Sequence, residues 1–119
     1  MHDRNDYEKS MDLLQGTLDL IILQTLRWRP MHGYAISQAI KTDSRDVLQV
    51  DTGSLYPALH RLEKRRLIKS EWKVSENNQR AKYYQLTAAG KKHLAREQSR
   101  WNRLVEAMAG IMKARENEA

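Results

Sequence analysis

The sequence predicts a mainly α-helical fold with a two-stranded β-hairpin and a long helix at the end of the chain. Apolar residues recur every three or four positions in four segments, which is typical of helices that bury one face. Between residues 68 and 86 the spacing changes to that of strands. With 119 residues, 40% of them hydrophobic, the chain can build one small core and therefore one domain.

The first predicted helix covers residues 11–28 and ends before Pro30, because proline cannot continue a helix. Its apolar face consists of Leu14, Leu18, Ile21, Ile22 and Leu26. A second, shorter helix is predicted over residues 32–40, and the polar residues 41–51 connect it to a third.

The third predicted helix can begin at any of three capping residues, Asp51, Thr52 and Ser54. Its buried face consists of Leu55, Leu59 and Leu62. We expect Pro57 in the first turn, where its missing N–H does little harm.

The hairpin follows directly. One strand is indicated by Ile68, Trp72 and Val74, a second covers residues 82–86, and the polar residues 75–79 join them. Thr87 can cap the last helix. The apolar positions of that helix are Leu94, Trp101, Leu104, Val105, Met108, Ile111 and Met112.

Three short helices followed by a hairpin is the order of elements in a winged helix-turn-helix. In that fold the second and third helices form the DNA-reading pair, and the hairpin is the wing. We therefore expect residues 1–87 to form a DNA-binding domain with an N-terminal helix. Residues 88–119 are expected to form a dimerisation helix within the same compact unit.

The positive charge of the chain is concentrated where this fold would meet DNA. The whole chain has a formal net charge of +6, whereas residues 61–92 alone hold ten basic and three acidic residues, a net +7. Such an asymmetry indicates a polyanionic partner, with nucleic acid ahead of an anionic membrane surface. A solvated basic face without a partner is the alternative.

The composition also excludes several classes of protein. The chain contains no cysteine, which rules out disulfides, thiolate metal sites and thiol nucleophiles. The sequence contains neither a recognisable signal peptide nor a membrane span, so a cytoplasmic location is expected.

The face of the third helix opposite its leucines is expected to enter the major groove. Arg61 can donate two hydrogen bonds to a guanine edge, whereas Lys64 is better suited to a phosphate. His60 either contacts a base or stays solvated, and Tyr56 either contacts a phosphate or packs with its hydroxyl in water. The predicted DNA-binding residues of this helix are Thr52, Ser54, Tyr56, Pro57, His60, Arg61 and Lys64.

In the wing, Arg80 and Lys82 flank the turn and can reach a DNA backbone or minor groove. Lys73 is a further candidate on the first strand of the wing. Double-stranded DNA is thus the predicted partner.

The last helix is too long to lie on its own core. Residues 88–115 would span about 42 Å at 1.5 Å per residue, against a radius of gyration of about 13 to 14 Å for a domain of this size. Its apolar stripe would be bare in a monomer, so we expect a C2 homodimer. The predicted dimerisation residues are Met11, Leu14, Leu94, Trp101, Leu104, Val105, Met108, Ile111 and Met112.

Trp101 and Leu14 are also the predicted lining of an effector pocket. Two copies of Trp101 would meet near the dyad and can stack on a planar aromatic ligand. The alternative is that the indoles fill the dimer core and bind no ligand.

An enzyme is the first alternative function. The four histidines are scattered and accompany no glycine-rich phosphate loop and no clustered carboxylates. His60 and Glu63 have the spacing of metal ligands on a helix, but a lone pair of this kind is usually helix surface. We therefore predict no catalysis, no metal and no cofactor. A winged helix that binds RNA or protein is the second alternative.

Several runs of residues resemble the PadR family of bacterial transcriptional regulators, and the resemblance covers about residues 14–112. The most specific run is residues 52–63 (TGSLYPALHRLE), and the others are residues 16–18 (GTL), 32–36 (HGYAI) and 82–87 (KYYQLT) with Gly90. The resemblance implies a dimeric repressor of a near-palindromic operator, with residues 52–66 as reading helix and residues 75–82 as wing. The single C-terminal helix is similar to that of the short subfamily. The two Trp101 indoles that are expected to face each other near the dyad resemble the arrangement in relatives that sense drugs or phenolic compounds.

The chain departs from the family pattern at two places, the end of the third helix and the tip of the wing. Arg66 stands where the family usually has glycine, and a residue with a β-carbon enters the left-handed conformation at a helix end at a cost of about 1 kcal/mol or more. Asn77 and Asn78 replace the common glycines of the wing tip. A tight turn is still expected there, since asparagine tolerates positive φ.

Overall fold

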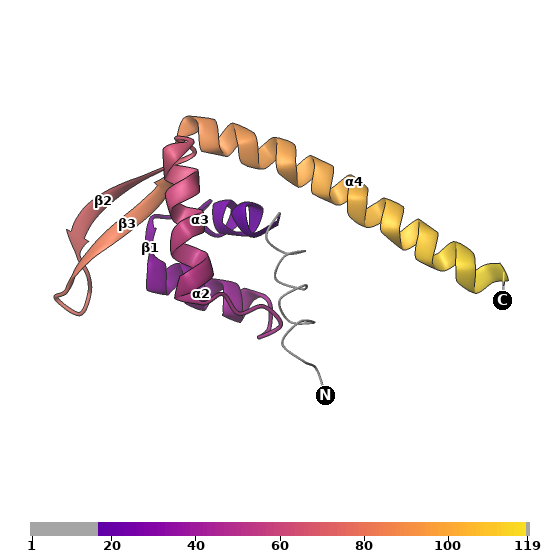
Figure 1. Cartoon of the computed structure of the whole chain (residues 1–119), viewed down its shortest axis with the longest axis horizontal. Helices are drawn as coiled ribbons and strands as arrows, with labels where there is room; N and C mark the ends of the chain where they lie inside the picture. Colours follow the sequence, from indigo (N-terminus) through magenta and orange to yellow (C-terminus); the bar gives the residue numbers. More distant parts are fainter. Residues whose placement is uncertain (1–16, 119) are drawn as a thin grey trace.

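The computed structural model describes residues 17–118, with side chains as far as residue 114. The elements are a first helix (residues 17–25), β1 (Met31–His32), α2 (Gly33–Asp43), α3 (Thr52–Lys64), β2 (Ile68–Val74), β3 (Arg80–Leu86) and α4 (Ala88–Glu118). In Figure 1 the hairpin of β2 and β3 projects from one end of the helical domain, and α4 runs out from the other. The predicted winged helix-turn-helix with a long C-terminal helix is confirmed.

One hydrophobic core joins the helices to the hairpin. Its fully buried large side chains are Ile22, Leu23, Leu26, Ile36, Leu55, Leu59, Leu62 and Ile68. They include the three leucines predicted to form the buried face of α3. Ala58 is also buried and widens that face.

Leu94 of α4 also belongs to this core, with only 4% of its surface exposed. It is therefore buried in its own chain rather than free to pack against a second copy, which corrects the dimer prediction at this position. The reason is its place in the second turn of α4, which still covers the domain. Only the later part of the helix leaves it.

A third strand, not predicted from the sequence, pairs with the wing. The sheet is antiparallel with the order β1-β3-β2. Met31 pairs with Tyr84 and His32 with Tyr83, which ties the segment before α2 to the base of the hairpin. A strand of two residues has no period of its own, so the sequence pattern carried no signal for it.

The second helix begins at a histidine and ends later than predicted. Nδ1 of His32 accepts a hydrogen bond of 3.2 Å from the backbone N–H of Ala35, so the imidazole serves as the N-cap. The helix continues to Asp43 instead of Ile40. The added residues are polar and exposed, and for that reason no apolar spacing marked them.

Asp51 caps α3, because its Oδ1 accepts a hydrogen bond of 2.8 Å from the N–H of Ser54. The helix therefore starts at Thr52, which puts Pro57 in its second turn and not in the first turn as predicted. Pro57 has no N–H to donate to the carbonyl of Gly53. Gly53 is exposed, so water can bind this carbonyl instead.

At each of the two departures from the family pattern one residue, Arg66 or Asn78, adopts the left-handed backbone. Arg66 has φ 61°, and the next N–H, of Leu67, donates to the carbonyl of Leu62 at 3.0 Å, as in a Schellman motif. At the wing tip Asn78 has φ 60°, and its N–H donates to the carbonyl of Ser75 at 2.9 Å. The predicted tight turn of the wing is confirmed.

The last helix extends far beyond the domain. Its 31 residues span about 46 Å at 1.5 Å each. The radius of gyration of 16.8 Å exceeds the value of about 13.5 Å for a compact chain of this length. Side chains 101–114 are all exposed, so the predicted overhang is confirmed. Within residues 17–118, none of the helices has the length and apolar character needed to cross a membrane.

Candidate nucleic-acid interface

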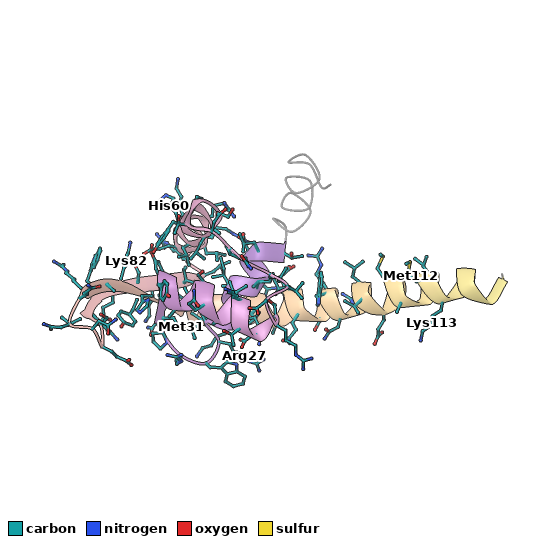
Figure 2. The ribbon with its side chains drawn as sticks, turned by 90° about the horizontal axis from the view of Figure 1, so that it is seen from below. Arg27, Met31, His60, Lys82, Met112 and Lys113 are labelled. Carbon is teal, nitrogen blue, oxygen red and sulfur yellow. The ribbon has the colours of Figure 1, made fainter. Side chains whose placement is uncertain are left out.

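The outer face of α3 presents a ridge formed by Pro57, His60 and Lys64, all exposed and opposite the buried leucines. Figure 2 shows His60 on the outer side of the helix, with Arg27 on the opposite side of the molecule. A ridge of this kind on the second helix of a helix-turn-helix is the part that enters a major groove.

The N-terminal end of α3 is already occupied by a carboxylate, that of Asp51. Thr52 is exposed and Ser54 is half-buried beside it. Because the backbone N–H of Ser54 donates to Asp51, the phosphate contacts predicted for these two residues would come from their hydroxyls.

Arg61 lies at the edge of this ridge and not at its centre. Its Nη2 is 3.1 Å from Oδ1 of Asp19 in the first helix, and both side chains are partly buried. The buried Ala58 extends the inner face of α3 toward this edge, which explains the difference from the predicted face. The ion pair between Arg61 and Asp19 must therefore break, or the guanidinium must use its other N–H groups, before Arg61 can bind a guanine.

Lys82 connects the wing to α3. Its Nζ is 3.6 Å from Oε1 of Glu63, and the hydroxyl of Ser70 donates to Oε2 of the same carboxylate. Glu63, which has the spacing of a metal ligand relative to His60, thus has a structural role: it holds Lys82 and Ser70 of the wing. Among the described residues there is no group of three or more side chains suited to hold a metal.

The remaining wing cations rest on aromatic rings on opposite faces of the sheet. The guanidinium of Arg80 is 5.0 Å from the ring centroid of Trp72 on the face turned toward α3. The ammonium of Lys73 is 5.8 Å from the ring of Tyr83 on the other face. Successive residues of a strand point to opposite faces, so Lys73 and Arg80 cannot serve the same contact surface.

A cleft of about 440 Å³ separates the wing from the N-terminal ends of α2 and α3. Its lining includes Tyr34, Tyr56, Trp72 and Tyr84 together with Arg80 and Lys82. Tyr56 lies against Gly33, where a β-carbon would collide with its ring. The ring of Tyr56 therefore has a packing role whether or not its hydroxyl also meets a phosphate.

Tyr84 lies at the buried end of this cleft. Burial raises the pKa of its phenol above the ordinary value of 10.0, and the negative charge of Glu63 raises it further. Tyr34 and Trp72 were not predicted as site residues. The sequence did hold a signal for them, because both are aromatic residues in or beside the elements that were predicted to bind DNA.

A second cavity, of about 540 Å³, lies between the first helix, α2 and α4. Trp101 and Trp28 are both in its lining, with Leu20, Ile21 and Met31. Trp101 is 42% exposed and thus already takes part in a groove within one chain. Leu14 and Met11, the other residues predicted for the effector pocket and the dimer, lie outside the described residues.

Beyond this groove, α4 carries the predicted apolar stripe. Its members Leu104, Val105, Met108, Ile111 and Met112 are all exposed in the single chain. In Figure 2, Met112 lies above the helix and Lys113 below it, so the side chain that follows Met112 points away from the stripe.

The fold and this surface together define a winged-helix DNA-binding protein. Residues 22–96 match the model of the transcriptional regulator PadR-like family. A relative from Lysinibacillus sphaericus, itself uncharacterized, is 30% identical over 105 residues, which are 88% of this chain and 96% of the relative. The chain belongs to the PadR family.

Solved structures agree with this assignment. A transcriptional regulator from Clostridium thermocellum is 31% identical with a TM-score of 0.74, over 82% of this chain and 94% of that one. A PadR family regulator from Eggerthella lenta is 29% identical with a TM-score of 0.73, over 91% and 94% of the two chains. A PadR-like regulator from Bacillus cereus is 27% identical with a TM-score of 0.75, over 85% and 96%. Members of this family are transcriptional regulators and not enzymes, as predicted.

Proposed function

We propose that the protein is a homodimeric repressor that binds a near-palindromic operator and leaves it when a planar aromatic effector binds. The observation that carries this proposal is that the positive charge lies on the two elements of the winged helix, α3 and the wing, that are expected to contact DNA. The basic segment of residues 61–92, with a net +7, begins on α3 and includes the whole wing. A basic helix next to a basic hairpin favours a duplex as the partner.

A homodimer is supported by the bare stripe on α4. Large apolar side chains in one continuous row are unusual on a monomer and mark an interface. A second copy related by a two-fold axis covers the stripe with the same residues, Trp101, Leu104, Val105, Met108, Ile111 and Met112. Residues 88–119 thus dimerise, and residues 1–87 bind DNA.

The dimer presents two copies of α3 to two half-sites about 34 to 36 Å apart, one turn of the duplex. His60 and Arg61 face base edges, while Lys64 and the hydroxyls of Thr52 and Ser54 contact phosphates. The wing adds Arg80 and Lys82, with Lys73 turned to the other face of the sheet.

Selection of binding sites from random duplex DNA tests the proposal directly. We expect an enriched palindrome, and a competing structured RNA should displace it poorly. If each protomer neutralises about four phosphates, log K should fall with log salt at a slope of about −7. Equal affinity for selected and random duplexes at moderate salt would refute sequence-specific regulation, and activation of transcription from the selected site would refute repression.

The dimer has its own test. Removal of residues 101–119 should leave a monomer or an insoluble chain. Met108→Glu places a charge in the stripe and should also give a monomer in analytical ultracentrifugation. Glu106→Lys, on the opposite side of the helix, should remain dimeric. A well-folded dimer after the truncation would contradict the role of α4.

The effector is supported by the groove that contains Trp101 and Trp28. Titration with phenolic acids and other planar aromatics should quench tryptophan emission and weaken operator binding. Trp101→Ala should lose the response. If a stable Trp101→Ala dimer binds the same compounds equally well, Trp101 fills the interface and senses nothing.

A further inference from the structure

Trp72 is a large apolar side chain that the fold leaves 57% exposed. It lies in the outer half of β2, where its cross-strand partner is Lys82, and Arg80 is the diagonal neighbour on the same face. The guanidinium carbon of Arg80 is 5.0 Å from the centre of the indole ring, within the range of a cation–π contact. Packing of the core does not explain this tryptophan, because the core ends at the base of the hairpin.

The way in which Arg80 is held distinguishes it from Arg61 and Lys82. Arg61 is paired with Asp19, and Lys82 with Glu63. Within the described part of the chain, Arg80 makes no ion pair and rests on a neutral ring. Its position is thus restricted while its charge stays uncompensated.

A guanidinium stacked on a ring keeps its N–H donors free, since they point outward in its own plane. A flat cation of this kind fits a narrow minor groove, where the electrostatic potential is most negative. Runs of A·T pairs narrow the groove, whereas the exocyclic amino group of guanine obstructs its floor.

We propose that Trp72 is a specificity-determining residue that holds Arg80 in place, so that the wing selects A·T-rich minor grooves beside each half-site. This inference rests on the proposed function, because it requires the wing to meet duplex DNA. Trp72 acts as a positioning residue, and Arg80 makes the contact with the groove.

The experiment uses the full-length protein and three duplexes that share one selected operator. The base pairs flanking each half-site are A·T, G·C or inosine·C. Inosine lacks the minor-groove amino group of guanine but keeps the major-groove face of guanine, so it separates the two grooves. Wild type should bind the A·T and inosine·C duplexes alike and the G·C duplex more weakly.

The variants are Trp72→Ala, Trp72→Phe and Arg80→Ala, and Arg27→Ala is the matched control. Arg27 is stacked on Trp28 at 4.9 Å, away from the reading ridge, so its removal deletes a charge from an equivalent pair elsewhere (Figure 2). Trp72→Ala should weaken binding to the A·T duplex about 3- to 30-fold, the range of a cation–π contact, and should abolish the flank preference. Trp72→Phe keeps an aromatic face and should retain most of the preference, and Arg27→Ala should retain all of it.

The outcomes separate this inference from the function on which it rests. If wild type binds a duplex of random sequence as tightly as the three operator duplexes, the proposed function fails and the inference fails with it. If wild type binds the operator specifically but ignores the flanks, or if folded Trp72→Ala keeps the flank preference that Arg80→Ala loses, the inference alone is overturned.

Discussion

The hydroxyl of Thr87 donates a hydrogen bond of 2.7 Å to the backbone carbonyl of Arg66 and accepts one of 3.0 Å from the N–H of Gly90. One side chain thus caps the start of α4 and holds the end of α3. The backbone N–H of Thr87 adds a bond of 3.1 Å to the carbonyl of Leu67. Because these three hydrogen bonds are short and each has a backbone group as a partner, the direction of α4 is tied to that of α3.

Gly90 should be irreplaceable at this junction. A β-carbon there would overlap the carbonyl oxygen of Leu67, which is backbone and cannot easily move. We expect Gly90→Ala to lower the free energy of unfolding by about 1 to 3 kcal/mol, as overpacking does, although alanine favours helices. Urea denaturation at equal protein concentration measures this.

Gly110 provides the matched control, because it lies in the same helix and a β-carbon there meets nothing within 4 Å. Gly110→Ala should raise stability by about 0.5 to 1 kcal/mol. Equal effects of the two substitutions would show that the junction is looser than the contacts indicate.

Replacing Arg66 by glycine should stabilise the folded protein. Its φ of 61° belongs to the left-handed region, which costs a residue with a β-carbon about 1 kcal/mol or more. Arg66→Gly should therefore raise the midpoint of urea denaturation. Arg65, with φ −80°, is the control, and Arg65→Gly should lower the midpoint instead. A loss of stability in Arg66→Gly would mean that the arginine side chain stabilises the junction in another way.

The order of elements, the wing and the overhang of α4 were predictable from the sequence, because each depends on a period of apolar residues. The two-residue strand at Met31 and the polar last turn of α2 carry no such period. The position of Pro57 depended on which of three possible caps the helix uses, and the sequence alone does not choose between them.

Part of the candidate site was likewise predictable from the sequence, and part was not. The exposure of His60 and Lys64 follows from the spacing of the leucines on α3. The pairing of Arg61 with Asp19 and of Lys82 with Glu63 joins residues far apart in the chain, so no local pattern contains it. Leu94 has the spacing of the dimer stripe, and only the course of α4 over the domain shows that it is buried.

Tyr84 should make the fold sensitive to alkali. Its pKa is raised in the folded state, chiefly by burial, so the unfolded chain loses the phenolic proton first as the pH rises. The stability that the neutral phenol contributes is complete below the unfolded pKa, near 10, and is lost between that pH and the higher folded value.

Tyr84→Phe should therefore flatten the fall of unfolding free energy above about pH 10, compared with wild type. Tyr34→Phe is the control, because Tyr34 is exposed. A wild-type slope in Tyr84→Phe would show that other groups, such as lysines, account for the alkaline loss.

Asp19 should oppose DNA binding. In the free protein its carboxylate holds Arg61 at 3.1 Å, and DNA must compete for that guanidinium. Asp19→Asn keeps the shape of the side chain and removes the charge. We expect the variant to bind the operator about 1.5- to 5-fold more tightly, the range of an ion pair that water still reaches, whereas Arg61→Ala should lose about 1 to 3 kcal/mol of binding free energy. Titrations of one labelled operator compare wild type, both single variants and the double variant.

If Arg61 is the group that Asp19 restrains, the gain from Asp19→Asn disappears in the Arg61→Ala background. A gain of the same size in both backgrounds would instead assign the effect to the general negative charge of Asp19 and would show that Asp19 does not restrain Arg61.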